Sequence, residues 1–134
     1  MLPLIAELKQ EHQTIVQLLN DVDSLGVESA QGRHKLMEAQ DIFMNHLKKE
    51  DEQVHALLSE AEKNSPDLRE IMYLMHFNLK DVSRFVIEFF EKYASTDNQE
   101  EFASDYNLIR VLLQNRIRRE ERVLFREFEK VAHA

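Results

Sequence analysis

The sequence predicts an all-α fold, an up-down-up-down antiparallel four-helix bundle in which residues 1–134 form one domain. One observation is the scarcity of turn-forming residues. The 134 residues include only 2 Gly and 2 Pro, whereas average usage would give roughly sixteen of them together. Because sheets need many chain reversals, this scarcity argues against a sandwich, a barrel or a doubly wound α/β fold. The other observation is that apolar residues recur at spacings of three and four in four segments, as they do in amphipathic helices.

The first two helices are expected at residues 3–23 and 32–63. Pro3 suits the first turn of a helix, and the stretch 24–31, which contains Gly26, is expected to be a loop. In the first helix the apolar stripe consists of Ile5, Leu8, Ile15, Leu19 and Val22. In the second helix it consists of Leu36, Phe43, Val54, Leu57 and Leu58.

The last two helices are expected at residues 66–94 and 99–131. Ser65 is predicted to cap the third helix, with Pro66 at its first position. The stretch 95–98 reads Ser-Thr-Asp-Asn and predicts the last break, with Thr96 or Asp97 as a cap. Four amphipathic helices joined by short connections favour an antiparallel bundle.

Each predicted helix places a metal-ligand type of side chain where its stripe calls for an apolar one. The five positions are His12, His46, Glu50, His76 and Glu120. One such residue alone is usually a hydrogen-bonded core residue, but residues from all four helices can fall in one layer of a bundle. Burying a carboxylate without a partner is costly, and a cation offsets that cost. Imidazole and carboxylate without thiolate suit iron, manganese or zinc.

The composition excludes several classes of protein. Cys is absent, so a disulfide framework, a thiolate metal site and a cysteine nucleophile are excluded. The net charge is -8 and no basic tract is long enough to follow phosphates, so nucleic acid is not an expected partner. The N-terminus lacks the pattern of a secretory signal, and no apolar run approaches the roughly 20 residues of a membrane span. We expect a cytoplasmic protein without a membrane partner.

These residues resemble the hemerythrin-like, or HHE cation-binding, family, and the resemblance covers nearly the whole chain. Its pieces are Glu11-His12, His46-x-x-x-Glu50, Met75-His76 and Glu120-Glu121. The resemblance implies a non-heme di-iron centre that binds or senses O2, NO or iron and is not catalytic. Carried over to this chain, His12 and His46 would hold the first iron. Glu50 and Glu120 would bridge it to a second iron at His76.

The chain departs from the family pattern at three positions, of which Arg126, in place of a proline, affects the helix end rather than the site. Arg116 stands where the family has a histidine ligand, and arginine offers no acceptor atom to a metal. Lys80 stands where oxygen-carrying hemerythrins have a further histidine. The number of iron ions, one or two, therefore stays open.

Three outcomes follow from Arg116, which the stripe places at the edge of the core face. In the first, one metal binds at His12, His46, Glu50 and Glu120. In the second, two metals bind and the irregular second site is completed by water or by Asn115, Tyr73 or Glu121. In the third, no metal binds and Arg116 turns inward to pair with Glu50 and Glu120.

Two further function classes compete with metal binding. A metal-free bundle would act as a regulatory or protein-interaction module, with the Arg116 charge in place of the metal. A histidine phosphotransfer bundle is a weaker variant, since it needs an exposed histidine such as His55 and a nearby glycine that this chain lacks. An enzyme is not expected, because carboxylate-bridged di-iron oxidases carry Glu-x-x-His pairs, and this chain has the pattern His46-x-x-x-Glu50 instead.

The stretch 85–90 reads Phe-Val-Ile-Glu-Phe-Phe and is apolar on more than one helix face. An exposed patch of this kind marks a homodimer interface in one interpretation. In the other, the bulky end of the bundle buries these side chains. The remaining histidines, His34, His55 and His133, are predicted to lie on the surface.

Overall fold

The computed structural model describes the chain except for residues 1–2, 55, 57–58, 61, 95–99 and 133–134, and the side chains of residues 54, 62, 76–79 and 131–132 are not described either. The described elements are all helical, and they are α1 (Pro3–Leu25), α2 (Ala30–Glu38), α3 (Gln40–Lys49), the π-helical η1 (Glu50–Val54), the 3-10 helix η2 (Glu62–Asn64), α5 (Pro66–Ala94), α6 (Phe102–Arg119), the π-helical η3 (Glu120–Leu124) and α7 (Phe125–Ala132).

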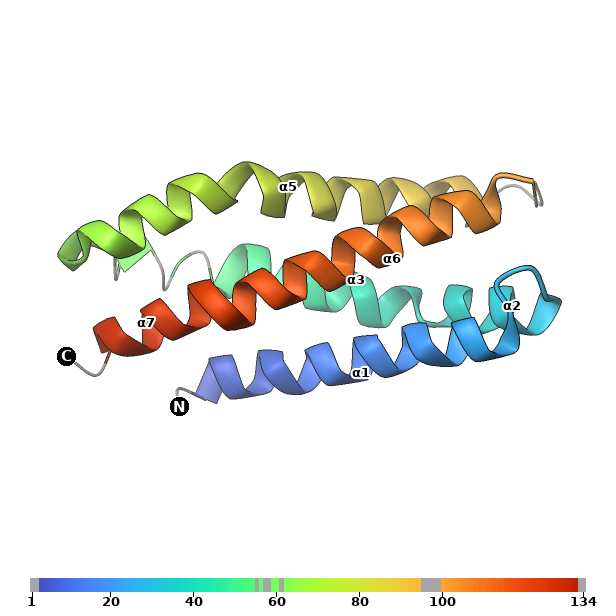
Figure 1. The fold of residues 1–134 in the computed structure, drawn as a ribbon, viewed down its shortest axis with the longest axis horizontal. Helices are drawn as coiled ribbons and strands as arrows, with labels where there is room; N and C mark the ends of the chain where they lie inside the picture. Colours follow the sequence, from blue (N-terminus) through green and yellow to red (C-terminus); the bar gives the residue numbers. More distant parts are fainter. Residues whose placement is uncertain (1–2, 55, 57–58, 61, 95–99, 133–134) are drawn as a thin grey trace.

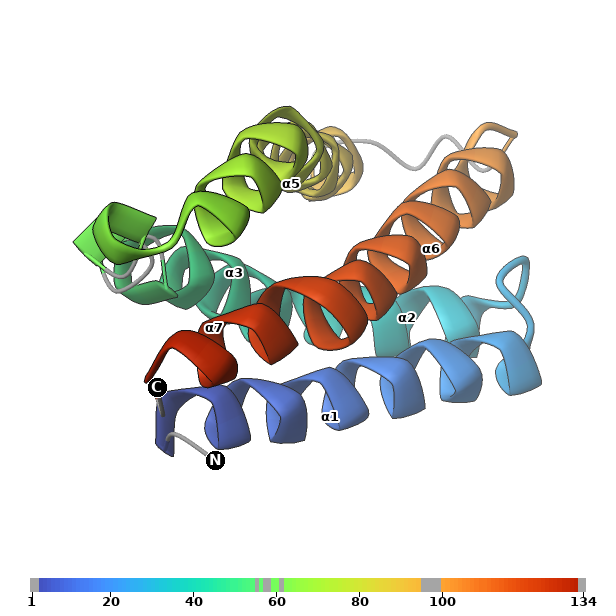
Figure 2. The same ribbon diagram turned by 60° about the vertical axis from the view of Figure 1, so that its left-hand side comes forward.

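The elements form an antiparallel four-helix bundle, as the sequence predicts. In Figure 1, α1 runs along the molecule and α2 and α3 return beside it. Helix α5 then runs the length of the bundle again, and α6 and α7 return, so both ends of the chain lie at the same end of the bundle. Helix α1 packs against α2, and α5 packs against α6, which Figure 2 shows from a second side. Within the described residues, no helix is both long enough and apolar enough to span a membrane.

Local capping chemistry explains where α5 and α2 begin. Helix α5 begins at Pro66, as predicted, because the Ser65 hydroxyl accepts a hydrogen bond from the Leu68 amide at 3.1 Å. The start expected at Gly32 is wrong by two residues. Ser29 caps α2 instead, since its hydroxyl accepts from the Gly32 amide at 2.9 Å. Helix α1 extends to Leu25, so the connection before Ser29 is short.

The second predicted helix is interrupted at Ala39, which separates α2 from α3. Ala39 has φ -82° and ψ 1°, and its amide donates to the Leu36 carbonyl at 3.1 Å. Neither Gly nor Pro marks this position, so the sequence pattern missed the break. Leu36, Ala39 and Phe43 are all buried in one apolar cluster, and we attribute the local bend to this packing.

Several expectations fall outside the described residues. These are the break at 95–98 with its caps Thr96 and Asp97, the surface positions of His55 and His133, and the inward side chains of Val54, Leu57 and Leu58. His34 is exposed, as predicted, and pairs with Glu38. In the apolar stretch 85–90, Val86, Phe89 and Phe90 are buried, whereas Phe85 and Ile87 are 38% and 39% exposed. The homodimer stays a prediction.

The apolar core consists of two clusters. The larger contains residues from Ile15 to Leu47 in α1, α2 and α3 and from Val82 to Leu113 in α5 and α6. The smaller lies towards the chain ends and contains Ile5, Leu8, Leu68, Met72, Met75, Leu124, Phe125 and Phe128. Along the helices, a layer of buried polar side chains falls between the two clusters: His12, His46, Glu50, Ser83, Arg116 and Glu120.

Two π-helical segments begin at the two buried carboxylates of this layer. Segment η1 begins at Glu50 and η3 begins at Glu120. In η3 the Phe125 amide donates to the Glu120 carbonyl five residues earlier, which adds one residue to the turn. Leu124 and Phe125 are therefore both buried, so the helix returns to the apolar core directly after its polar stretch.

Replacing Gly32 with Ala should destabilise the bundle by about 1–3 kcal/mol, as overpacking does. A Cβ at residue 32 would lie 2.1 Å from the Gly26 carbonyl oxygen, which is backbone and cannot move aside cheaply. Thermal unfolding measures the effect. Gly26→Asn is the comparison, because a Cβ there finds only ordinary contacts and the positive φ of 90° strains Asn less than most other residues. A loss at Gly32 no larger than that at Gly26 would contradict the close approach.

Candidate metal centre

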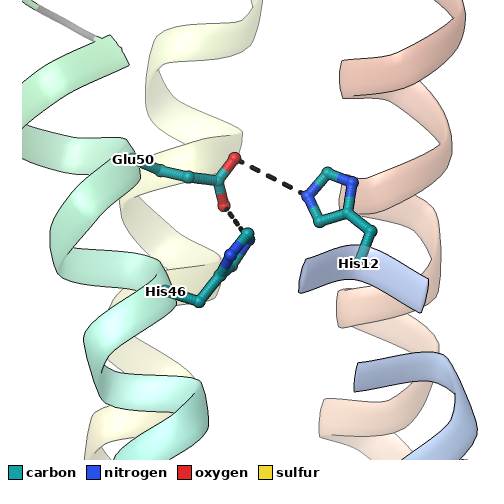
Figure 3. A group of neighbouring side chains, drawn as sticks. All are labelled: His12, His46 and Glu50. Atoms are coloured by element: carbon teal, nitrogen blue, oxygen red, sulfur yellow. Dashed lines mark ion pairs between the residues drawn. The ribbon is translucent and has the colours of Figure 1, made fainter. Parts of the chain in front are cut away.

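Three buried side chains converge between α1 and the helix formed by α3 and η1. His12 comes from α1, His46 from α3, and Glu50 begins η1 one turn later. One ligand atom from each lies within 4.8 Å of the other two. The Nε2 atom of His46 is 2.7 Å from Glu50 Oε1, and the Nε2 atom of His12 is 3.9 Å from Glu50 Oε2. Figure 3 shows both imidazoles directed at the carboxylate.

The facing atoms of this group lack hydrogen-bond partners. His12 Nε2, His46 Nε2 and Glu50 Oε2 are buried, and none has a hydrogen bond within the described part of the chain. The short contact between His46 and Glu50 does not have hydrogen-bond alignment. Buried polar atoms without partners cost free energy, so these atoms mark a place where a cation would be stabilised.

Each imidazole is held through its other ring nitrogen by a carboxylate. His46 Nδ1 lies 2.7 Å from Glu11 Oε1, and His12 Nδ1 lies 2.9 Å from Glu121 Oε2. Because an ionised carboxylate only accepts hydrogen bonds, Nδ1 carries the proton and donates in both pairs. In the neutral form of each ring the lone pair is then on Nε2, which faces Glu50. This carboxylate–histidine arrangement is typical of histidines that bind metals.

A lysine fixes one of the two outer carboxylates. Lys49 contacts both Glu7 and Glu11, and Glu11 in turn accepts the hydrogen bond from His46. Burial raises the pKa of Glu11, but its contacts with Lys49 and His46 outweigh burial and lower the pKa below the ordinary value. Glu11 is therefore ionised at neutral pH and is a strong acceptor for His46.

The charges inside the core are strongly coupled. Burial raises the pKa of Glu50, but the imidazoles of His12 and His46 and the charge of Arg116 outweigh burial and lower the pKa to about 2. Burial lowers the pKa of His46, but its contacts with Glu50 and Glu11 outweigh burial and raise the pKa. Glu50 is therefore a carboxylate at neutral pH, and the protein must neutralise it within the core.

Arg116 lies inside the core, although the sequence pattern placed it at the edge of the stripe. The residue is 2% exposed, because its guanidinium has buried partners on three elements. Nε lies 3.0 Å from Glu120 Oε1, Nη1 donates to Ser83 Oγ at 2.7 Å, and Nη2 lies 3.4 Å from Glu50 Oε1. The guanidinium also lies 3.7 Å from Asp51. These contacts are the ones expected if Arg116 turns inward.

The structure brings three of the five predicted ligands together. His12, His46 and Glu50 form the group described above. Glu120 is buried, but its Oε1 atom contacts Arg116 rather than either imidazole. The side chain of His76 is outside the described residues.

Two side chains that were expected to complete an irregular second site point away from the core. Tyr73 is 73% exposed and Asn115 is exposed. Each lies at a helix position that faces solvent, so neither supplies a ligand in this arrangement. Glu121, the third candidate, is committed to His12.

Sequence reasoning did not find the roles of Glu11, Glu121 and Ser83. The pair Glu11-His12 is adjacent in sequence, yet Glu11 bonds to His46 across the helix interface. His12 takes its carboxylate from Glu121 at the far end of the chain. The sequence signal for the two glutamates is weak: each is adjacent to a residue predicted to face the core, His12 or Glu120. No sequence pattern marks Ser83.

The donor set fits one cation and does not fit two. His12, His46 and Glu50 present two imidazole nitrogens and one carboxylate oxygen that lack hydrogen bonds. The fixed positive charge of Arg116 lies between the carboxylates of Glu50 and Glu120, and Arg116 approaches the same Glu50 oxygen as His46. A second cation there would meet the guanidinium at close range, which is repulsive in a core of low dielectric constant.

Comparison with known proteins identifies a family. The family model described as the hemerythrin HHE cation binding domain matches residues 3–128. Neither the curated proteins nor the solved structures give a match.

Replacing Arg116 with Met should lower the free energy of unfolding of the chelator-treated protein by about 3–5 kcal/mol. The guanidinium neutralises two buried carboxylates, and Met removes its charge while keeping much of its length. Urea denaturation followed by circular dichroism measures the loss. Arg119→Met is the control, because Arg119 is exposed and such a change costs within about 0.5 kcal/mol. Equal losses in the two variants would contradict the role of Arg116.

Proposed function

Because the chain belongs to the hemerythrin HHE cation-binding domain family, we propose that it binds one metal ion with His12, His46 and Glu50. The observation that carries this proposal is the pairing of both Nδ1 atoms with carboxylates, while both Nε2 atoms face Glu50 without a hydrogen bond from the described residues. A purely structural pair of core histidines has no need of this arrangement. A metal ligand does, because the outer carboxylate fixes the tautomer and makes the ring more basic.

Iron is the metal that we propose for this site. Two imidazoles and one carboxylate are the ligand types that non-heme iron accepts, and they also suit manganese and zinc. A bound iron would supply an open coordination position to O2 or NO. The protein's own residues would orient the ligands and exclude water. The ring of His12 stacks on Phe125 with centroids 5.9 Å apart, and Leu8 and Ile15 are buried one turn to either side of it.

We propose a role in binding or sensing rather than catalysis. The described core offers no general acid or base beside the trio other than groups already engaged with one another. The non-catalytic role and the identity of the ligand rest on the family resemblance, and the proposed cytoplasmic location rests on the sequence features described above.

The specific observation for a metal-free alternative is the set of Arg116 contacts. Its guanidinium already neutralises part of the charge of Glu50 and Glu120, so the bundle has an internal cation. In that case the protein would act as a regulatory or interaction module. The two proposals differ in whether the three atoms without hydrogen bonds around Glu50 hold an ion.

Metal analysis of protein purified without chelator separates the two proposals. We expect about one ion per chain, and we expect chelation to lower the melting temperature. An ion bound only by the folded state adds about 4 kcal/mol at a thousandfold excess over its dissociation constant. His12→Gln should lose the ion, whereas His34→Gln should keep it, because His34 is exposed and pairs with Glu38 on its own helix. No ion, together with a melting temperature unaffected by chelator, would favour the metal-free module.

Exposure of the iron-loaded protein to NO under anaerobic conditions tests the ligand. We expect a new visible absorption band and a change in the paramagnetic resonance signal, since a site with three protein ligands leaves coordination positions open. His12→Gln loaded with the same amount of iron controls for iron bound elsewhere. A spectrum unchanged by NO, in protein shown to contain iron, would exclude a diatomic ligand and leave metal binding itself intact.

A further inference from the structure

A basic groove lies on the surface between α1 and the last helix of the bundle, which consists of α6, η3 and α7. It has a volume of about 570 Å³ and is lined by residues of α1, α6, η3 and α7. Four of its lining side chains are cations: Lys9 comes from α1, and Arg118, Arg122 and Arg126 follow one another along the last helix. The partly exposed side chains of Val16 and Ile117 add apolar surface.

The four cations of this basic groove share a lack of ion pairs within the described part of the chain. Lys9, Arg118, Arg122 and Arg126 form no ion pair with any residue that the structure describes. Elsewhere, basic residues such as Lys92 and Arg110 pair with carboxylates. The whole chain has a net charge of -8, so carboxylates are abundant. What distinguishes these four cations is that they line one groove together.

The one carboxylate that lines the groove does not neutralise the arginines. Glu121 faces the groove with 34% of its side chain exposed, but its Oε2 atom accepts the hydrogen bond from His12 at 2.9 Å. The carboxylate of Glu121 therefore contacts the His12 imidazole rather than an arginine of the groove. The groove thus keeps an excess of positive charge on its outer rim, where an anion from solution would approach.

We propose that this basic groove binds a small anion that carries two or more phosphate groups. Arginine guanidinium groups bind phosphate oxygens with paired hydrogen bonds, and several cations match several phosphate charges. A volume of about 570 Å³ falls within the range of roughly 300–1,000 Å³ for small-molecule sites. The apolar surface of Val16 and Ile117 would contact an organic part of the ligand, such as the base and sugar of a nucleotide.

Calorimetric titration of the protein with pyrophosphate and with ADP tests the proposal. The titration is done on the protein as purified and again after chelation, because the groove lies outside the trio of His12, His46 and Glu50. We expect saturable binding of one anion per chain in both preparations, weakening as salt is added, because surface charges are screened. Binding of both probes would indicate recognition of the phosphates. Tighter binding of ADP would add a contribution from the apolar surface.

Two double variants of equal charge provide the matched control. Arg122→Gln with Arg126→Gln removes two cations from the groove and should weaken binding by about tenfold or more, since a hydrogen bond to a charged group contributes at least that much. Lys48→Gln with Lys80→Gln removes two exposed cations elsewhere and should leave binding within about twofold. All four side chains are exposed, and circular dichroism checks that both variants fold.

Two results would overturn the proposal. One is the absence of saturable binding with either probe at low salt. The other is equal weakening in the two double variants, which would show that only the overall charge matters. Neither result bears on the proposed metal site, because metal content is measured separately.

Discussion

The structure depends on one costly feature, a carboxylate buried in the middle of a helical bundle. Glu50 is 5% exposed, and an ionised group in that position must be neutralised within the core. The bundle does this from two sides. Arg116 and His46 both approach Oε1 of the carboxylate, and His12 faces Oε2. The division of the apolar core into two clusters follows, because neither cluster can extend through a charged layer.

The outer contacts explain why the imidazoles face inward as they do. Two neighbouring histidines could hydrogen-bond to the central carboxylate and complete a closed network. Instead their Nδ1 atoms are bound by Glu11 and Glu121, and their Nε2 atoms have no hydrogen bond within the described chain. The same two glutamates lie at the surface of the bundle, where Lys49 holds one and the basic groove surrounds the other. The buried centre is therefore connected to two different surface environments.

Arg116 changes what the centre can hold. In the family to which the chain belongs, the resemblance implies two cations and a bridging pair of carboxylates. Here the guanidinium lies between Glu50 and Glu120 and is also fixed by Ser83. The guanidinium supplies, beside Glu120, the positive charge that the resemblance assigns to a second metal ion. The Nε2 atoms of His12 and His46 still have no hydrogen bond within the described residues. The centre therefore combines the built-in positive charge of Arg116 with three buried atoms of His12, His46 and Glu50 that have no hydrogen bond within the described residues.

The sequence alone determined the helices, the antiparallel bundle and the inward faces of His12, His46 and Glu50, because helical periodicity and local capping are short-range properties. It located the start of α5 at Pro66 but missed the break at Ala39, where tertiary packing decided the bend. The scarcity of Gly and Pro predicted few connections, yet Gly32 serves a close backbone approach inside α2 rather than a helix start. Only the tertiary structure decided that Arg116 is buried and that Glu11 pairs with His46 and Glu121 with His12. These pairings join residues from different helices, and their energies depend on burial and distance, which no spacing along one helix can specify.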